Sequence, residues 1–233
     1  MPQPLRTHDA PVPLNIAIDG PVASGKTVVG RALARRLGLR FLDTGTMYRA
    51  VTWAAVERGL DMGDVEALSD LAEDMDIRVE LQEGEQRIVV EGTDVTDLMR
   101  SQQVELNVSD VSAISGVRRA LVSQQRRIAA QDPLGIVVVG RDIGTVVLPD
   151  APVKVFLEAS LHIRVRRRYD EFRRKGDIRD MERLTAEIQM RDKIDSERAD
   201  SPLRPAIDAV RIETDGLRID QVVGRIQGLI AAS

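Results

Sequence analysis

Gly20-Pro21-Val22-Ala23-Ser24-Gly25-Lys26-Thr27 follows an apolar run, Leu14 to Ile18, that ends in Asp19. Two glycines flank four free positions and precede Lys and Thr, which is the strict phosphate-loop pattern. The backbone of such a loop curls around a nucleotide triphosphate with its N–H groups pointing inward, so the side chains within it must be small. Lys26 would then reach the outer phosphates, and the hydroxyl of Thr27 would bind Mg²⁺.

The residues around the loop favour phosphate binding over a strand-to-helix turn that merely fits the pattern. The apolar run before the loop is typical of a buried strand. After the loop, the spacing from Val28 to Leu37 places Val29, Leu33 and Leu37 on one face of a helix. A helix that begins here directs the positive end of its dipole at a bound anion. The loop indicates the phosphate donor but not the acceptor, because one phosphate cradle serves many reactions.

The composition is that of a soluble globular protein, with 43% hydrophobic and 30% charged residues among 233. This length suffices for one sizeable core, or for a core with an inserted subdomain. The net charge of −4 says little about partners. The absence of Cys excludes disulfides and Cys-based metal sites and fits a reducing compartment. The proline-rich start, residues 1–13, has no apolar segment, so we expect a disordered tail and a cytoplasmic protein rather than a signal peptide or membrane anchor.

Strand and helix patterns alternate along most of the chain, which predicts an α/β fold with a parallel sheet. The run Ile136 to Val139 is the most apolar and predicts a central strand buried on both faces. The other strands are expected at Arg40–Asp43, Val153–Leu157 and Ala209–Glu213. Helices are expected at Ala50–Arg58, Leu60–Met75, Val104–Ala130 with a break at Ser115-Gly116, Met181–Asp195 and Ile219–Ile230.

A hairpin pattern interrupts this alternation. Polar and apolar side chains alternate over Asp76 to Leu81 and again over Arg87 to Gly92, and a polar turn around Gly84 lies between them. A hairpin at this place indicates an insertion. We therefore expect a core made of residues 14–60 and 113–233, with an inserted subdomain at residues 61–112.

Two turns have the residues of an anion or ligand site, and each has a structural alternative. Thr44, a glycine and Arg49 at the start of a helix suit a phosphate, but equally a helix cap beside a surface ion pair. Arg141 and Asp142 lie between two glycines at the carboxyl end of a buried strand, where ligands bind in open α/β sheets. A tight turn with a local ion pair remains the alternative there.

Two charged segments follow. The basic run Leu161 to Arg174 fits a nucleic-acid patch, a solvated helix face or a mobile cover over phosphates. Few aromatic residues interleave with it, and its position after two sheet strands favours the cover, a lid at about 161–180. Further on, Arg191, Asp195 and Arg198 project together from a helix end, either into a site or as a surface ladder of ion pairs.

Five motifs, in this order, resemble those of the bacterial cytidylate kinases of type 1, which are nucleoside monophosphate kinases of the P-loop class. The resemblance covers nearly the whole chain from Leu14 onward. It implies a three-layer P-loop NTPase fold: a central parallel sheet, an inserted acceptor-binding subdomain with the hairpin, and a short helical lid. The motifs are Ile18–Thr27, Leu42–Arg49, Gly140–Val147, Pro149–Leu157 and Arg191–Arg198.

The resemblance also implies Mg²⁺-dependent transfer of the ATP γ-phosphoryl group to CMP or dCMP, by a monomer without nucleic-acid or membrane partners. The implied ATP site consists of Gly20, Pro21, Val22, Ala23, Ser24, Gly25, Lys26, Thr27, Val28 and Arg167, with Thr27 as metal ligand. The implied CMP site consists of Thr44 and Tyr48 at the entrance, Arg49, Arg141 and Arg198 on the phosphate, Ser109, Arg118 and Asp142 on the cytosine edge, and Arg191 and Asp195 on the ribose. The implied catalytic groups are Lys26, Arg141, Arg164 and Arg168, of which Arg164 and Arg168, like Arg167, are lid arginines.

One departure from the family pattern concerns the metal. Relatives commonly carry an acidic residue directly before the Gly-Arg-Asp motif, where this chain has Val139. Another group must then order the magnesium waters, and the sequence does not distinguish Asp19 from Asp43. Two rival functions stay open: a small-molecule kinase acting on UMP, AMP or shikimate, and an NTP-dependent regulator that binds nucleic acid through the basic run.

Overall fold

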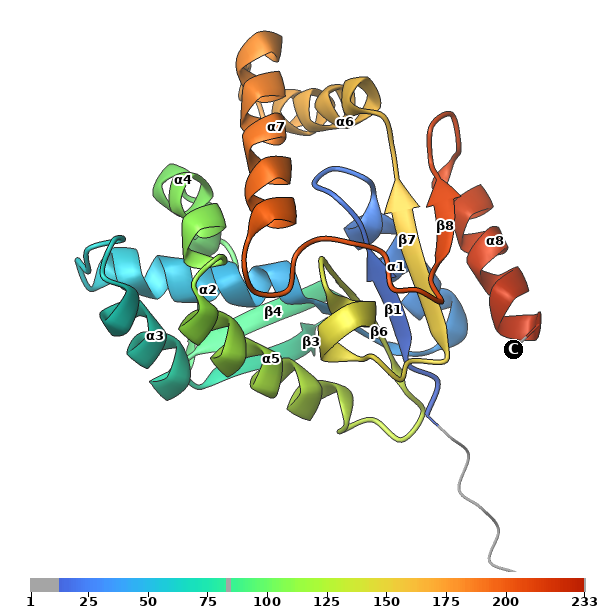
Figure 1. Cartoon of the computed structure of the whole chain (residues 1–233), viewed down its shortest axis with the longest axis horizontal. Helices are drawn as coiled ribbons and strands as arrows, with labels where there is room; N and C mark the ends of the chain where they lie inside the picture. Colours follow the sequence, from blue (N-terminus) through green and yellow to red (C-terminus); the bar gives the residue numbers. More distant parts are fainter. Residues whose placement is uncertain (1–12, 83–84, 233) are drawn as a thin grey trace, which may run out of the picture.

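The computed structural model describes residues 13–82 and 85–232, so the predicted tail lies outside the described residues except for Pro13. Its centre is a five-stranded parallel sheet in the order β2-β6-β1-β7-β8 (Figure 1). The parallel sheet is as predicted. The apolar strand β6 is buried along its whole length, but the middle position belongs to β1. The strands are β1 Ile16–Asp19, β2 Arg40–Asp43, β6 Ile136–Gly140, β7 Val153–Glu158 and β8 Val210–Glu213.

Helices cover both faces of this sheet, which gives the three layers. Alternate residues of each strand point to opposite faces: Ile16 and Ile18 pack with helices α1 (Lys26–Leu37) and α8 (Ile219–Ala232), whereas Ala17 packs with helices α2 (Thr44–Glu57) and α5 (Ser115–Ala129). Among the described residues, no helix is long and apolar enough to cross a membrane.

The predicted hairpin is present. Strands β3 (Ile77–Gln82) and β4 (Glu85–Val90) pair antiparallel, and a short strand β5 (Thr93–Asp94) extends them. Helices α3 (Val65–Asp74) and α4 (Gln102–Val111) flank this small sheet. Buried side chains of β3, β4, α3 and α4 join those of α2 and α5 in one hydrophobic cluster. The exact limits of the insert, 61 and 112, stay a prediction.

Helices α6 (Leu161–Arg174) and α7 (Met181–Glu197) lie beyond the carboxyl ends of the sheet strands (Figure 1). They pack on each other through a small apolar cluster of Val165, Phe172, Leu184 and Ile188. The basic run thus forms one helix, as predicted. Because this cluster is separate from those around the sheet, α6 and α7 are built as a unit above the core.

Helix α2 begins six residues earlier than the apolar spacing predicts. Asp43, rather than Thr44, caps it, since the Asp43 carboxylate accepts the N–H of Gly45 at 3.1 Å. The predicted break in the segment 104–130 is also real, but it falls between Val111 and Ser115, and Ser115 already belongs to α5.

Candidate active site

A cavity of about 1240 Å³ lies at the carboxyl ends of the parallel strands, between the phosphate loop, α2, the hairpin, α4 and the lid helices. It is large enough for more than one small ligand. Most of the residues predicted for the site line it: Val22, Ala23, Ser24, Gly25, Lys26, Thr27, Val28, Thr44, Tyr48, Arg49, Arg118, Arg141, Asp142, Arg167, Arg168, Arg191, Asp195 and Arg198. Four predicted residues do not: Gly20, Pro21, Ser109 and Arg164.

The phosphate loop begins at a glycine that no other residue could replace without a backbone shift. Gly20 has φ 150°, and a Cβ built on it would lie 2.2 Å from the carbonyl oxygen of Leu157. Helix α1 then starts at Lys26, whose buried Nζ donates to the Pro21 carbonyl at 2.6 Å. Burial, with the nearby charge of Arg141, lowers the pKa of Lys26 well below its ordinary value. The lysine therefore points back into its own loop and has no carboxylate at hydrogen-bonding distance among the described residues.

Asp43 is the carboxylate beside the predicted metal ligand. Its Oδ2 accepts the hydroxyl hydrogen of Thr27 at 2.7 Å. Asp19, the other candidate, accepts the N–H groups of Ile143 and Gly144, each at 2.8 Å, and burial raises its pKa to about 6. Asp19 thus holds the turn after β6, whereas Asp43 is available at Thr27.

This donor set fits Mg²⁺. A hydroxyl and one carboxylate are hard oxygen donors, and Mg²⁺ in nucleotide sites takes its other ligands from water and phosphate. Among the described residues there is no group of three or more His, Cys, Asp and Glu that would hold a metal by themselves. A hydroxyl and one carboxylate leave the other ligand positions to water and phosphate, so the residues present fit this ion.

A buried network of opposite charges occupies the far part of the cavity. Arg118 donates to Asp142 at 2.5 Å and lies 5.4 Å from the centre of the Tyr48 ring, and both members of the ion pair are less than 5% exposed. Arg141 donates to Asp195 at 2.7 Å. Burial disfavours the charged form of Asp195, but the Arg141 guanidinium outweighs this effect and holds the pKa of Asp195 below its ordinary value. Arg198 joins the two pairs, 3.7 Å from Asp142 and 3.6 Å from Asp195.

Two arginines of the cavity, Arg49 and Arg191, have neither an ion-pair partner nor a side-chain hydrogen bond among the described residues. Burial lowers the pKa of Arg49. Burial also lowers the pKa of Arg191 to about 10, and the positive charge of Arg141 acts in the same direction. A bound anion would favour the charged form of both groups, and a phosphate offers the oxygens that guanidinium groups bind best.

The lid arginines differ in what they contact. Arg167 donates to the Ser24 carbonyl at 3.1 Å and to the Thr214 hydroxyl at 3.0 Å, directly at the phosphate loop. Arg168 pairs with Glu105 of α4, which also lies 3.6 Å from Arg179 at the other end of the lid. The lid and the insert are thus joined through one carboxylate of the insert.

Arg164 lies behind the phosphate loop instead of in the large cavity. It is 7% exposed, pairs with Asp192 at 2.6 Å and donates to the Val22 carbonyl at 3.3 Å. In this conformation it supports the loop from outside, and its predicted role over the phosphates stays a prediction. Ser109 is half-buried on α4, where Val108 and Ser112 line the cavity in its place.

Gln86 and Glu105 line the cavity and were not predicted. Neither belongs to a motif that carries chemistry, and Gln86 lies in the segment expected to be a polar turn. Only the folding of the insert against the core brings these two side chains to the site.

The sequence comparison decides the family. The profile described as "Cytidylate kinase" matches residues 16–232. The chain belongs to the cytidylate kinase family. A cytidylate kinase of Exiguobacterium sibiricum is 47% identical, over 93% of this chain and 96% of that protein. One of Lactobacillus gasseri is 42% identical, over 93% of this chain and 94% of that protein. The resemblance in the five motifs is therefore confirmed, and as a family member the chain is an ATP-dependent phosphotransferase with small nucleotide substrates.

A solved structure shares the fold. An uncharacterized protein from Eubacterium ventriosum superposes with a TM-score of 0.50 at 14% identity, covering 94% of this chain and 99% of that chain. At this identity the likeness concerns the fold alone.

Proposed function

We propose that the chain transfers the γ-phosphoryl group of ATP to CMP or dCMP, giving ADP and CDP or dCDP, with Mg²⁺, as a cytoplasmic monomer. The observation that carries the proposal is the Arg118–Asp142 pair, buried in the same cavity as the phosphate loop and the unpaired Arg49 and Arg191. In this proposal residues 61–112 form the acceptor insert and residues 161–180 the lid.

The charge of the pair suits a cytosine edge. Cytosine has an amino group, from which the Asp142 carboxylate would accept a hydrogen bond. It also has hydrogen-bond acceptors on the ring, to which Arg118 would donate. Uracil has a carbonyl oxygen in place of the amino group. That oxygen would face the Asp142 carboxylate, and because both groups are acceptors no hydrogen bond could form between them. Sites built to hydrogen-bond a substrate N–H reject analogues that lack it, because the buried polar group is then left unpaired.

The acceptor is an anion already, so the transfer needs alignment and neutralised charge rather than a strong base. The proposal assigns Arg49, Arg141 and Arg198 to the acceptor phosphate, and Arg191 and Asp195 to the ribose. Lys26 would exchange the Pro21 carbonyl for the outer phosphates of ATP, and Arg168 would exchange Glu105 for them as the lid closes. Closure also excludes water, a competing acceptor.

Thr27 and Asp43 would hold the metal side of the site, Thr27 through its hydroxyl and Asp43 through ordered water. When bound, Mg²⁺ would neutralise charge that develops on the phosphates during transfer. In this proposal Asp43 orders the magnesium waters, a role that the apolar side chain of Val139 cannot fill.

An acceptor panel tests the proposal. ADP release coupled to an indicator is measured with CMP, dCMP, UMP, AMP and shikimate, each with ATP and Mg²⁺. CMP and dCMP should be turned over with a kcat/KM at least about 100-fold above that for UMP, the discrimination expected when a buried hydrogen bond is lost. Equal rates with UMP or AMP would refute the base recognition assigned to Arg118 and Asp142.

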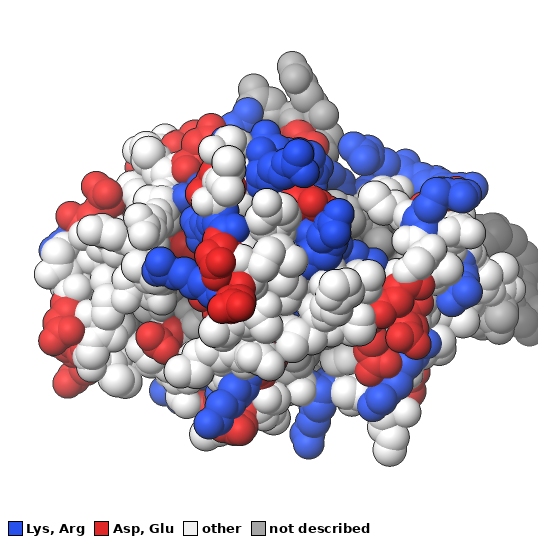
Figure 2. All heavy atoms as spheres, turned by 90° about the horizontal axis from the view of Figure 1, so that it is seen from above, with Lys and Arg blue, Asp and Glu red and all other residues white. Residues whose placement is uncertain are grey.

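The charges on the face seen in Figure 2 and along the basic helix do not favour a nucleic-acid partner. On the face seen in Figure 2, Lys and Arg side chains lie in separate groups with Asp and Glu between them. On the basic helix, Arg166 pairs with Asp170 and Lys175 with Glu171. We accordingly propose that small molecules are the partners, and strongly salt-dependent binding of RNA or DNA would contradict this.

A further inference from the structure

Gln86 of the hairpin reaches into the core and holds the backbone of Asp43. It is 8% exposed and lines the cavity. Its amide oxygen accepts the N–H of Asp43 at 2.8 Å, and its amide nitrogen donates to the hydroxyl oxygen of Thr46 at 2.7 Å. That hydroxyl donates in turn to the carbonyl of Asp43 at 2.6 Å. Both main-chain polar groups of Asp43 are thus fixed, directly or through Thr46, by one side chain of the insert.

The carboxylate of Asp43 is held at the same time from the core side. One oxygen accepts the hydroxyl hydrogen of Thr27 at 2.7 Å, and the other accepts the N–H of Gly45 at 3.1 Å. With its backbone pinned by Gln86, the carboxylate has little freedom to leave Thr27. Hydrogen-bonding partners behind a group on the metal side of a site commonly determine its orientation.

We propose that Gln86 is a positioning residue for the metal-side carboxylate: it keeps Asp43 aimed at Thr27, and so couples the insert to the Mg²⁺–nucleotide site. This inference rests on the proposed function, because it takes Thr27 and Asp43 as the metal side. The Gln86 amide meets both demands at this position. It accepts from an N–H and donates to a hydroxyl, whereas a methionine of similar length donates nothing and accepts only weakly.

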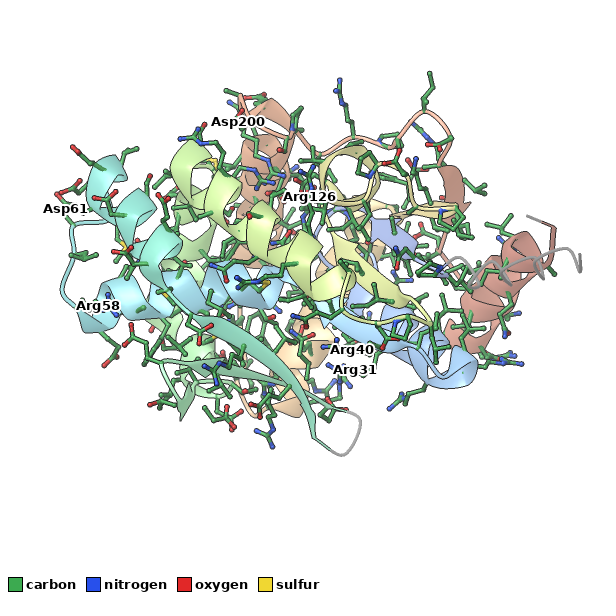
Figure 3. The ribbon with its side chains drawn as sticks, turned by 90° about the horizontal axis from the view of Figure 1, so that it is seen from below. Arg31, Arg40, Arg58, Asp61, Arg126 and Asp200 are labelled. Atoms are coloured by element: carbon green, nitrogen blue, oxygen red, sulfur yellow. The ribbon has the colours of Figure 1, made fainter. Side chains whose placement is uncertain are left out.

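A purely structural role is the competing explanation, since Gln86 also anchors the hairpin to the core. A second link makes the two roles separable. Glu85, the neighbouring residue, pairs with Arg31 of α1 at 2.5 Å, and in Figure 3 Arg31 lies by the end of the hairpin. Glu85→Gln therefore loosens the same hairpin without touching Asp43 and serves as the matched control.

The test is the affinity of the full chain for ADP, measured by titration calorimetry in Mg²⁺ and again in EDTA. The ratio of the two dissociation constants reports the gain in affinity that the metal provides. In Gln86→Met this gain should fall about 10-fold, the lower end of the effects known for such supporting residues, while the affinity in EDTA stays within about 2-fold of the wild type. Glu85→Gln should keep the gain.

Thr46→Val provides a second variant should Gln86→Met fold poorly. It removes the hydroxyl that links the Gln86 amide to the Asp43 carbonyl, and a loss of about 3-fold in the gain supports the same role. If Gln86→Met keeps the full gain in ADP affinity from Mg²⁺ but unfolds at a lower temperature, the inference is overturned, and Gln86 only anchors the hairpin. A wild type that shows no gain with Mg²⁺ overturns the proposed metal site, and the inference with it.

Discussion

Replacing Asp142 by Ala removes the carboxylate that faces two buried guanidinium groups. Arg118 donates to Asp142 at 2.5 Å and is only 2% exposed, and Arg198 lies 3.7 Å from the other carboxylate oxygen. In the variant, Arg118 keeps a hydrogen bond to the Ser112 carbonyl at 3.0 Å. A single carbonyl does not neutralise a buried cation, so the folded state holds an uncompensated charge.

The expected loss follows from the burial of both partners. Removing one member of a buried ion pair costs about 3–5 kcal/mol. In a chain of 233 residues each kcal/mol moves the unfolding midpoint by about 2–4 °C. Asp142→Ala should therefore unfold about 6–20 °C below the wild type.

A double variant separates this loss of stability from the loss of base recognition. Asp142→Ala with Arg118→Met removes both charges, and apolar replacement of a whole buried pair is often neutral or stabilising. The double variant should unfold close to the wild type, yet keep the catalytic defect: a KM for CMP that rises far more than the KM for ATP.

The measurements are thermal unfolding followed by circular dichroism, and steady-state kinetics at a temperature well below all midpoints. Two results would refute the reasoning. One is an Asp142→Ala variant that unfolds within about 1 °C of the wild type, which would mean that the pair adds nothing to stability. The other is a double variant with an unchanged KM for CMP, which would remove Arg118 and Asp142 from the acceptor site.

Three further predictions concern single charges of the site. Lys26→Ala should keep the fold, by circular dichroism, but lose at least about 100-fold in kcat; near-normal turnover would contradict its role. In the folded protein the pKa of Asp19 is about 6, against an ordinary value of 3.8, so the folded state binds the proton more tightly than the unfolded state. Between about pH 4 and 6 the free energy of unfolding of the wild type should therefore fall, relative to that of Asp19→Asn, as the pH rises. Above pH 7 the difference between the two proteins in denaturant unfolding should be constant. Arg191→Met should raise the unfolding midpoint by about 1–8 °C and raise the KM for CMP, because it removes a half-buried cation that has no ion-pair partner among the described residues. Arg183→Met, exposed on the same helix, is the control and should change neither.

The fold could be predicted from the sequence where its signal is local. The apolar runs at β1 and β6 and the loop between β1 and α1 are each decided by a few consecutive residues, and these predictions are confirmed. The start of α2 was placed wrongly because the apolar spacing begins at Ala50. The helix itself begins where Asp43 caps it, and a cap depends on backbone geometry that spacing does not report.

The pairing of side chains could not be predicted, since it depends on which elements become neighbours. Asp19 and Asp43 end two similar strands, and β6 lies between these strands in the sheet. Only the fold directs Asp43 to Thr27 and Asp19 to the turn after β6. Arg164 and Arg168, four residues apart on α6, seemed equivalent in the sequence, yet one packs behind the phosphate loop and the other faces the cavity.

The charges of the cavity suggest why base recognition alone would not make a substrate. Arg118 and Asp142 satisfy each other before any ligand binds, whereas Arg49 and Arg191 have lowered pKa values and lack an ion-pair partner among the described residues. The charged form of Arg49, which the proposal assigns to the acceptor phosphate, is therefore disfavoured until that anion arrives, and binding the phosphate would relieve the cost. Cytidine offers the base and the ribose without the anion, so it would leave Arg49 without a partner. In the proposed function the acceptor phosphate would thus supply binding energy that the base cannot. The phosphates rather than the cytosine would then draw Arg168, which pairs with Glu105 in this structure, over the site.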